Sequence, residues 1–270
     1  RPDSPIDEVI RSDCTIGGGY GNKIQTSSPE ATIAGGRANV IETNADYSTI
    51  SGGDDNLIES SSTRAAIGGG EGNKIGTNCS YAVVPGGYRN HIESHSEKTS
   101  IAGGADNWIR TNSYGSAIAG GIANIIVDSE LASITGGLGN RIYDGSDYSL
   151  VGGDNNKIMG KSPHAVIAGG GMNEIGTNSS SSVIAGGQIQ IIEDNAAYAM
   201  IAGGHLNRAS SYSFAAGYKA HATNQGAFVW SDSTGTTTRS TTNNSVTFRA
   251  SGGYRFFTGT GNSGAQLRAG

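Results

Sequence analysis

The sequence predicts an all-β fold, a parallel β-solenoid (β-roll or β-helix) built from 17-residue repeats. The first observation is a phrase, Ile-x-Gly-Gly-x-x-Asn-x-Ile, that returns twelve times. The second is its spacing of 17 residues, shortened to 16 in two units that start at Ile118 and Ile134. The third is the recurrence of Gly-Gly pairs and of Ser/Thr/Asn runs, which interrupt any helical pattern. Such a strict period indicates stacked units that bury their apolar edges against their neighbours.

Each unit is predicted to form one coil with two short strands. The phrase opens at Ile16, Ile33, Ile50, Ile67, Val84, Ile101, Ile118, Ile134, Leu150, Ile167, Ile184 and Ile201. One strand carries this opening aliphatic residue, and the other carries the Asn-x-Ile segment. Alternation along a strand turns the Asn and the second Ile inward and the residue between them outward. Stacked coils therefore predict an inward Ile ladder beside an inward Asn ladder.

The Asn column is interrupted once, by Gln190. Its members are Asn22, Asn39, Asn56, Asn73, Asn90, Asn107, Asn124, Asn140, Asn156, Asn173 and Asn207. Stacked amides can hydrogen-bond from coil to coil, so a structural role is predicted for them. The glycine pairs are expected to supply permissive backbone at a tight corner. They do not match phosphate loops, because no helix and no Lys-Ser/Thr follow them.

Three regions are predicted: an N-terminal cap or lead-in at 1–15, the solenoid at 16–208, and a different C-terminal segment at 209–270. Only 35% of residues are hydrophobic and 44 of 270 are Gly, so the core is thin and association of several chains is expected to complete the burial. Cys14 and Cys79 lie about four coils apart, roughly 19 Å, which predicts no disulfide within the chain.

The charge excludes some partners. A net charge of −5 argues against a general binder of nucleic acid or anionic membranes. No apolar run approaches a membrane span, and the chain does not open with a signal peptide. Its start, Arg1-Pro2-Asp3, is expected to continue a preceding segment.

The C-terminal segment carries a resemblance to fibre proteins. Residues Ser213–Ala220 and Gly226–Asp232 resemble the head repeat of trimeric autotransporter adhesins. Residues Val246–Phe257 and Ala265–Gly270 are similar to the segment that precedes the self-cleaving intramolecular chaperone of phage tail fibres, tailspikes and related bacterial surface fibres. The resemblance implies an extracellular homotrimer on a cell surface or virion, ending about where the chaperone is removed. The trimer is expected to be held mainly by apolar C-terminal residues, including Phe214, Phe228, Trp230, Phe256 and Phe257.

Fibres of this kind commonly bind or depolymerise polysaccharides, so the repeat that departs most from the consensus is the candidate site. The repeat from Val84 to Ser100 concentrates Tyr88, Arg89, His91, His95 and Lys98. Further substrate-binding candidates come from neighbouring coils: Lys74 and Trp108 at the position of His91, and Tyr47, Arg64 and Tyr81 at the position of Lys98.

These residue types suit β-elimination on a uronic-acid polymer. Arg89 or Lys98 would stabilise the developing enolate, His91 or His95 would accept the C5 proton, and Tyr81 or Tyr88 would protonate the leaving oxygen. A polysaccharide lyase is thus predicted slightly ahead of a non-enzymatic adhesin, receptor-binding protein or structural stalk. The simpler alternative is that these side chains are ordinary solvated residues.

A second candidate uses carboxylates. Asp128 and Asp144 share a position in the two short coils, where stacking predicts a separation of roughly 5 Å. Such a pair fits a retaining glycoside hydrolase, or a Ca²⁺ site, and no other cofactor is expected. Because Asp is common in turns, a plain turn is the competing interpretation. Serine-hydrolase and zinc motifs are absent from the sequence.

Overall fold

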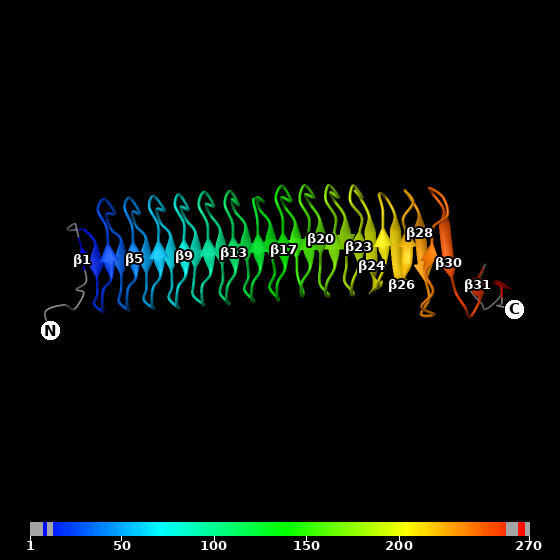
Figure 1. The fold of residues 1–270 in the computed structure, drawn as a ribbon, viewed down its shortest axis with the longest axis horizontal. Coiled ribbons are helices and arrows are strands. Elements are labelled where there is room, and N and C mark those ends of the chain that lie inside the picture. Colours follow the sequence, from blue (N-terminus) through cyan, green and yellow to red (C-terminus); the bar gives the residue numbers. More distant parts are fainter. Residues whose placement is uncertain (1–7, 10–12, 258–263, 268–270) are drawn as a thin grey trace.

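The protein is an all-β parallel β-solenoid, as predicted. A computed structural model describes residues 8–9, 13–257 and 264–267, and these contain no helix. The coils follow one another along a single axis and form a long rod, with the two chain ends at opposite ends (Figure 1).

Two 15-stranded parallel sheets run along the rod. Sheet A holds the strands of the Asn-x-Ile segments: β1 (Glu8–Val9), β3 (Lys23–Ile24), β5 (Val40–Ile41), β7 (Leu57–Ile58), β9 (Lys74–Ile75), β11 (His91–Ile92), β13 (Trp108–Ile109), β15 (Ile125–Ile126), β17 (Arg141–Ile142), β19 (Lys157–Ile158), β21 (Glu174–Ile175), β23 (Ile191–Ile192), β25 (Arg208–Ala209), β27 (Ala220–Ala222) and β29 (Thr238–Arg239).

Sheet B holds the strands that precede the glycine pairs and continues into the C-terminal segment. Its members are β2 (Thr15–Ile16), β4 (Thr32–Ile33), β6 (Thr49–Ile50), β8 (Ala66–Ile67), β10 (Val83–Val84), β12 (Ser100–Ile101), β14 (Ala117–Ile118), β16 (Ser133–Ile134), β18 (Leu150–Val151), β20 (Val166–Ile167), β22 (Val183–Ile184), β24 (Met200–His205), β26 (Phe214–Tyr218), β28 (Phe228–Ser231) and β30 (Val246–Arg249). An antiparallel pair, β31 (Tyr254–Phe257) and β32 (Gly264–Leu267), follows them.

Each coil gives one strand to each sheet, and equivalent positions of successive repeats pair. In sheet A, His91 pairs with Lys74 of the preceding coil and Trp108 of the next. In sheet B, Val83 pairs with Ala66 and Ser100 in the same way. A residue's surface neighbours therefore lie about 17 positions away in the sequence.

The interior is formed by two aliphatic ladders, one from each sheet. Ile75 of sheet A and Ile67 of sheet B represent them, and both side chains are fully buried. Each stacks on the equivalent residue of the neighbouring coil because the strands pair in register. The inward Ile ladder predicted from strand alternation is confirmed.

The inward Asn ladder is confirmed as well, and it closes the corner after each glycine pair. The Asn73 backbone N–H and its Nδ2 both donate to Oδ1 of Asn56, at 3.0 and 3.1 Å. Nδ2 also donates to the carbonyls of Gly69 in its own coil and Gly87 in the next, both at 2.9 Å. The hydrogen bonds of each Asn amide in this arrangement offset the desolvation cost of burying it.

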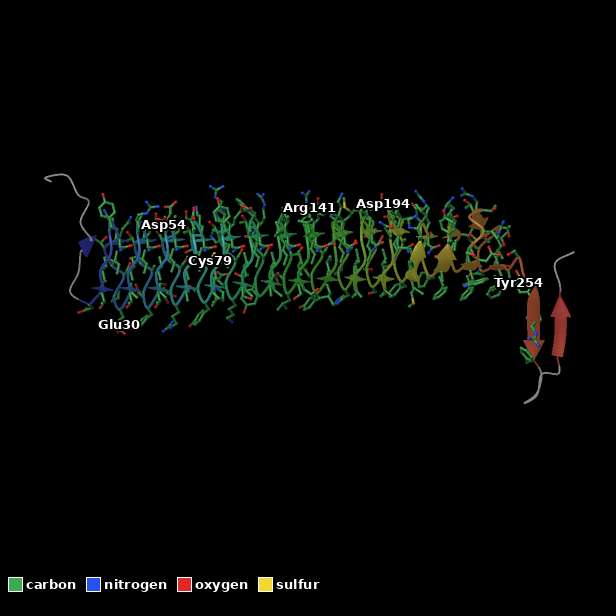
Figure 2. All side chains as sticks on the ribbon, turned by 90° about the horizontal axis from the view of Figure 1, so that it is seen from below. Glu30, Asp54, Cys79, Arg141, Asp194 and Tyr254 are labelled. Atoms are coloured by element: carbon green, nitrogen blue, oxygen red, sulfur yellow. The ribbon has the colours of Figure 1, made fainter. Side chains whose placement is uncertain are left out.

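A third interior column, of small hydroxyl and thiol side chains, was missed by the sequence analysis. Ser62 Oγ donates to the Gly76 carbonyl at 2.6 Å and accepts from the Cys79 backbone N–H at 2.9 Å. Cys79 lies inside the rod in this column, and its Sγ donates to the Glu93 carbonyl (Figure 2). Burial raises the pKa of the Cys79 thiol to about 11. Cys14 and Cys79 form no disulfide with each other, as predicted.

One ladder assignment was wrong. The repeat phrase places Leu150 at the inward position, but Val151 is the buried residue that pairs with Ile134 and Ile167. This coil lacks the residue that elsewhere separates the aliphatic position from the glycine pair. Shifting the strand by one residue keeps an aliphatic side chain in the core and turns Leu150 outward.

The two sheets extend beyond the predicted boundaries of the solenoid at 16 and 208. Strand β1 already belongs to sheet A, and β25 to β30 continue both sheets. Ala215 and Val229 extend the inward column of sheet B past Ile201, now with 14-residue spacing. The small side chains fit because the shortened coils enclose less space. Residues 268–270 of the fibre-like motif, and 1–7 and 10–12 of the predicted lead-in, lie outside the described residues.

Gln190, the one interruption of the Asn ladder, creates a local defect. Its Oε1 accepts from the Asn207 backbone N–H at 2.9 Å, but its buried Nε2 has no hydrogen-bond partner. We therefore expect Gln190→Asn to raise the melting temperature, because a satisfied buried donor is worth about 1–3 kcal/mol. Asn173→Gln is the matched reverse change and is expected to lower it. Equal melting temperatures for the two variants would contradict this account of the ladder.

Candidate functional site

The solenoid distributes the residues of the unusual repeat around the rod instead of gathering them. Tyr88 lies at the corner after the glycine pair, His91 faces outward on sheet A, and His95 and Lys98 occupy two later turns. One coil of 17 residues makes a full circuit, so side chains close in sequence point in different directions. Two of these candidates contact each other: the Arg89 guanidinium lies over the ring of the neighbouring Tyr88, 4.8 Å from its centroid.

The other candidates of this repeat contact residues of adjacent coils. His95 Nε2 lies 3.2 Å from Nδ2 of Asn78, in the coil before. Lys98 Nζ donates to the Tyr114 hydroxyl at 2.7 Å, in the coil after. This bond raises the pKa of Lys98, so the ammonium stays protonated. Surface sites on this fold are thus built from columns that cross coils.

The richest such column lies on the outward face of sheet A. Strands β9, β11 and β13 place Lys74, His91 and Trp108 on three consecutive rungs. The His91 and Trp108 rings meet at a centroid distance of 4.3 Å, and the Arg110 guanidinium lies 4.9 Å from the Trp108 ring. We call these four residues the Trp108 column.

Two carboxylates border the Trp108 column and pair with its cations. Lys74 contacts Glu59 at 2.5 Å, and Arg110 contacts Glu93 at 3.4 Å. The Arg110 side chain remains 44% exposed, so this pair is weak and open to exchange. A carboxylate brought by a ligand could replace Glu93 on Arg110 beside the indole.

His91 is held neutral by its surroundings. Burial lowers its pKa below the ordinary value, and the nearby positive charge of Lys74 lowers it further. A neutral imidazole can accept a proton, whereas an imidazolium cannot. Of the two predicted general bases, His91 therefore has the surroundings that suit this role.

The predicted line Tyr47, Arg64, Tyr81 and Lys98 exists as a ridge along one turn of successive coils. All four residues have positive φ, between 56° and 63°. Arg64 lies between the rings of Tyr47 and Tyr81, at 5.0 and 5.5 Å, and donates to the Tyr81 hydroxyl at 3.1 Å. Arg64 thus joins Tyr47 and Tyr81 through cation–π contacts, whereas Lys98 contacts the ring of Tyr114.

The same ridge continues toward the C-terminus with aromatic pairs that the sequence analysis missed. Tyr148 stacks on His164, and Tyr198 stacks on Tyr212, each at 5.1 Å. The signal was present in the repeat alignment, because Tyr148, His164 and Tyr198 occupy the same position as Tyr81.

The second predicted site, at Asp128 and Asp144, consists of exposed turn residues. Their backbone carbonyls occupy equivalent places, accepting from the N–H groups of Gly145 at 2.9 Å and Lys161 at 2.7 Å. Asp128 has a positive φ of 39°, which Asp tolerates better than most residues. In the part of the chain that the structure describes, no hydrogen bond or ion pair reaches either carboxylate, and no group of three or more His, Cys, Asp or Glu could hold a metal ion.

The outward face of sheet B was not singled out from the sequence, and it is uncharged. Its column, from β2 to β30, reads Thr15, Thr32, Thr49, Ala66, Val83, Ser100, Ala117, Ser133, Leu150, Val166, Val183, Met200, Phe214, Phe228 and Val246. The neighbouring position adds further small residues, including Ala34, Ser51, Pro85, Ala102 and Ala119. Charged side chains gather elsewhere on the rod, as Figure 2 shows for Asp54, Arg141 and Asp194 on one side and Glu30 on the opposite side.

The comparisons with known proteins leave the family open. No protein-family model matches this chain, and no curated protein is significantly similar to it. Among the described residues there is no helix long and apolar enough to cross a membrane.

Proposed function

We propose that this chain is a segment of an extracellular fibre that associates with copies of itself along sheet B and binds an acidic polysaccharide on sheet A. The observation that carries the proposal is the contrast between the two outward faces. Sheet B presents one uncharged column over all fifteen strands. The column of sheet A mixes aliphatic residues and two glutamates with many cations, and it includes His91 and Trp108.

Self-association is supported by the size and chemistry of the sheet B face. Fifteen strands spaced by about 4.8 Å give a length of roughly 70 Å, and three to four residues give a width of roughly 10–13 Å. The resulting area of roughly 700–900 Å² matches one side of a standard protein interface. At its C-terminal end the face becomes aromatic, with Phe214 stacked on Phe228 at 4.6 Å. Threefold assembly is our expectation from the resemblance to trimeric fibres.

Polysaccharide binding is supported by the Trp108 column. Binding sites for small ligands combine apolar and aromatic surface with a few polar groups that fix orientation. Trp108 supplies the aromatic surface, and Lys74 and Arg110 supply two cations for a sugar carboxylate. The expected ligand is a polymer that repeats a uronic acid.

A lyase reaction is the second candidate, and one observation favours it. Burial and the neighbouring cation Lys74 lower the pKa of His91, which favours the neutral imidazole that a general base requires. The structure records no contact between His91 and the tyrosines Tyr81 and Tyr88 among the described residues, so the proton donor would come from elsewhere. For this reason binding without cleavage is the first proposal.

We expect Trp108→Ala to weaken binding to alginate or polygalacturonate about tenfold, a loss of about 1.4 kcal/mol, because it removes the aromatic surface. Ile125→Ala, one rung further along the same column, is the matched control and is expected to bind normally. Binding is measured by calorimetry on the intact chain, and absorbance is followed for unsaturated products.

The outcomes separate the candidates. Binding without unsaturated products supports the fibre proposal. Formation of unsaturated products, at a rate that falls by about 10²–10⁴-fold in His91→Ala, supports the lyase instead. Absence of binding to every uronic-acid polymer would contradict a polysaccharide function at this column.

A further inference from the structure

A second cationic hollow lies where the 17-residue coils give way to shorter ones, far along the rod from the Trp108 column. Three consecutive rungs of sheet A carry Arg208 on β25, His221 on β27 and Arg239 on β29. Beside them is a hollow of about 300 Å³. Its polar lining includes Arg208, His221 and Lys219, and its apolar lining is formed by Ile189, Ile191 and Leu206.

The positive charges of this hollow are only partly compensated. Arg208 pairs with Glu193 at 2.8 Å. Lys219 Nζ donates to the Gly235 carbonyl at 3.0 Å and lies over the Tyr218 ring, which leaves its charge unpaired. Within the described residues the side chain of Arg239 forms no ion pair and no hydrogen bond. Among the described residues, Glu193 is the one carboxylate that pairs with these three cations, so the hollow keeps an excess of positive charge.

His221 adds an unsatisfied polar atom at the same place. Its Nδ1 is buried and has no hydrogen-bond partner. Burial lowers the pKa of the imidazole, and Arg239 and Arg208 lower it further, while Glu193 acts in the opposite direction. An unpartnered polar atom in a native structure is costly and points to a missing partner.

We propose that this hollow is an anion-binding site that takes a carboxylate, sulfate or phosphate group beside Lys219 and His221, which line it, with Arg239 on the adjoining rung. The anion neutralises the unpaired charges of Arg239 and Lys219 and accepts charge-assisted hydrogen bonds from these two side chains. The aliphatic wall of Ile189, Ile191 and Leu206 fits the apolar face of a group that bears the anion, such as an acidic sugar. The site is independent of the Trp108 column and goes beyond the function proposed for it.

The test uses the intact chain and two probes, inorganic sulfate and the monosaccharide galacturonate, at constant ionic strength set with chloride. Each probe is expected to raise the melting temperature saturably and to shift the His221 imidazole resonance in NMR spectra. Arg239→Gln is expected to weaken binding at least tenfold. Without any anion, this variant should be as stable as the parent or more stable, because it removes like-charge repulsion.

Arg141→Gln provides the matched control, because Arg141 faces outward on β17 of the same sheet and is expected to leave binding unchanged. Trp108→Ala should also leave binding of both probes intact, which separates this site from the polysaccharide surface. Tighter binding of galacturonate than of sulfate identifies an acidic saccharide as the source of the anion, and the reverse order identifies a free inorganic ion. Absence of saturable binding by both probes, or equal loss in Arg239→Gln and Arg141→Gln, would overturn the proposal.

Discussion

Ile126→Asp is expected to lower the stability of the rod by about 4–5 kcal/mol or more, or to prevent folding altogether. Ile126 has no exposed surface and belongs to the aliphatic ladder of sheet A. A carboxylate there would be buried without a partner, and its desolvation is among the most costly changes that a single residue can make. Thermal unfolding followed by circular dichroism measures the loss.

Ile125→Asp is the control for this change. Ile125 precedes Ile126 on the same two-residue strand, is the same residue type, and faces outward. We expect the change at Ile125 to alter stability by about 0.5 kcal/mol or less, as is usual for surface positions. Equal losses at the two positions would show that strand alternation does not place these residues as described.

Gly170→Ala is expected to destabilise the rod strongly for a steric reason. Gly170 has a φ of +85°, and a Cβ added there would lie 2.0 Å from the Gly187 carbonyl oxygen of the next coil. The same Cβ would lie 2.9 Å from Nδ2 of Asn173, in the Asn ladder. Because both neighbours belong to the rigid coil-to-coil bonding, relief requires the coils to separate, and we expect a loss of about 3 kcal/mol or more.

Gly169→Ala offers a control within the same glycine pair. A Cβ at Gly169 would meet nothing within 4 Å, and its φ lies outside the left-handed region. We expect a change of about 0.5 kcal/mol or less, the usual range for a surface substitution. The two melting curves would coincide if the glycine pairs served only as flexible turns.

The period alone was sufficient to predict the fold, because in a solenoid the local pattern and the tertiary contacts coincide. Asn73, Ile75 and their equivalents recur at one spacing. Alternation along the strand then places Asn73 and Ile75 inward and Lys74 outward. The shift from Leu150 to Val151 could not be predicted in this way. A 16-residue unit shows that one residue is missing, but only the pairing with Ile134 shows where.

The candidate site was predicted less well, since proximity in sequence was taken as proximity in space. His91, His95 and Lys98 lie within one repeat, yet each contacts an adjacent coil: His91 and Lys98 the coil after, and His95 the coil before. The pairing of His91 with Lys74 and Trp108 followed correctly from aligning the repeats. Reading every position as a column would also have found the uncharged face of sheet B.

The central proposal is that this uncharged face packs against copies of the same chain. A column without charge over fifteen strands is expected to be buried against copies of the same chain. Lysines introduced into it by Val83→Lys together with Ala117→Lys would place unpaired charges in the interface. The control is Leu57→Lys together with Ile125→Lys, which adds the same charge to the outward face of sheet A.

Sedimentation equilibrium of the intact chain tests this claim most directly. The account predicts a trimer of three 27.5 kDa chains for the parent and for the sheet A variant, and dissociation for the sheet B variant. A parent chain that sediments as a 27.5 kDa monomer across the accessible concentration range would contradict it.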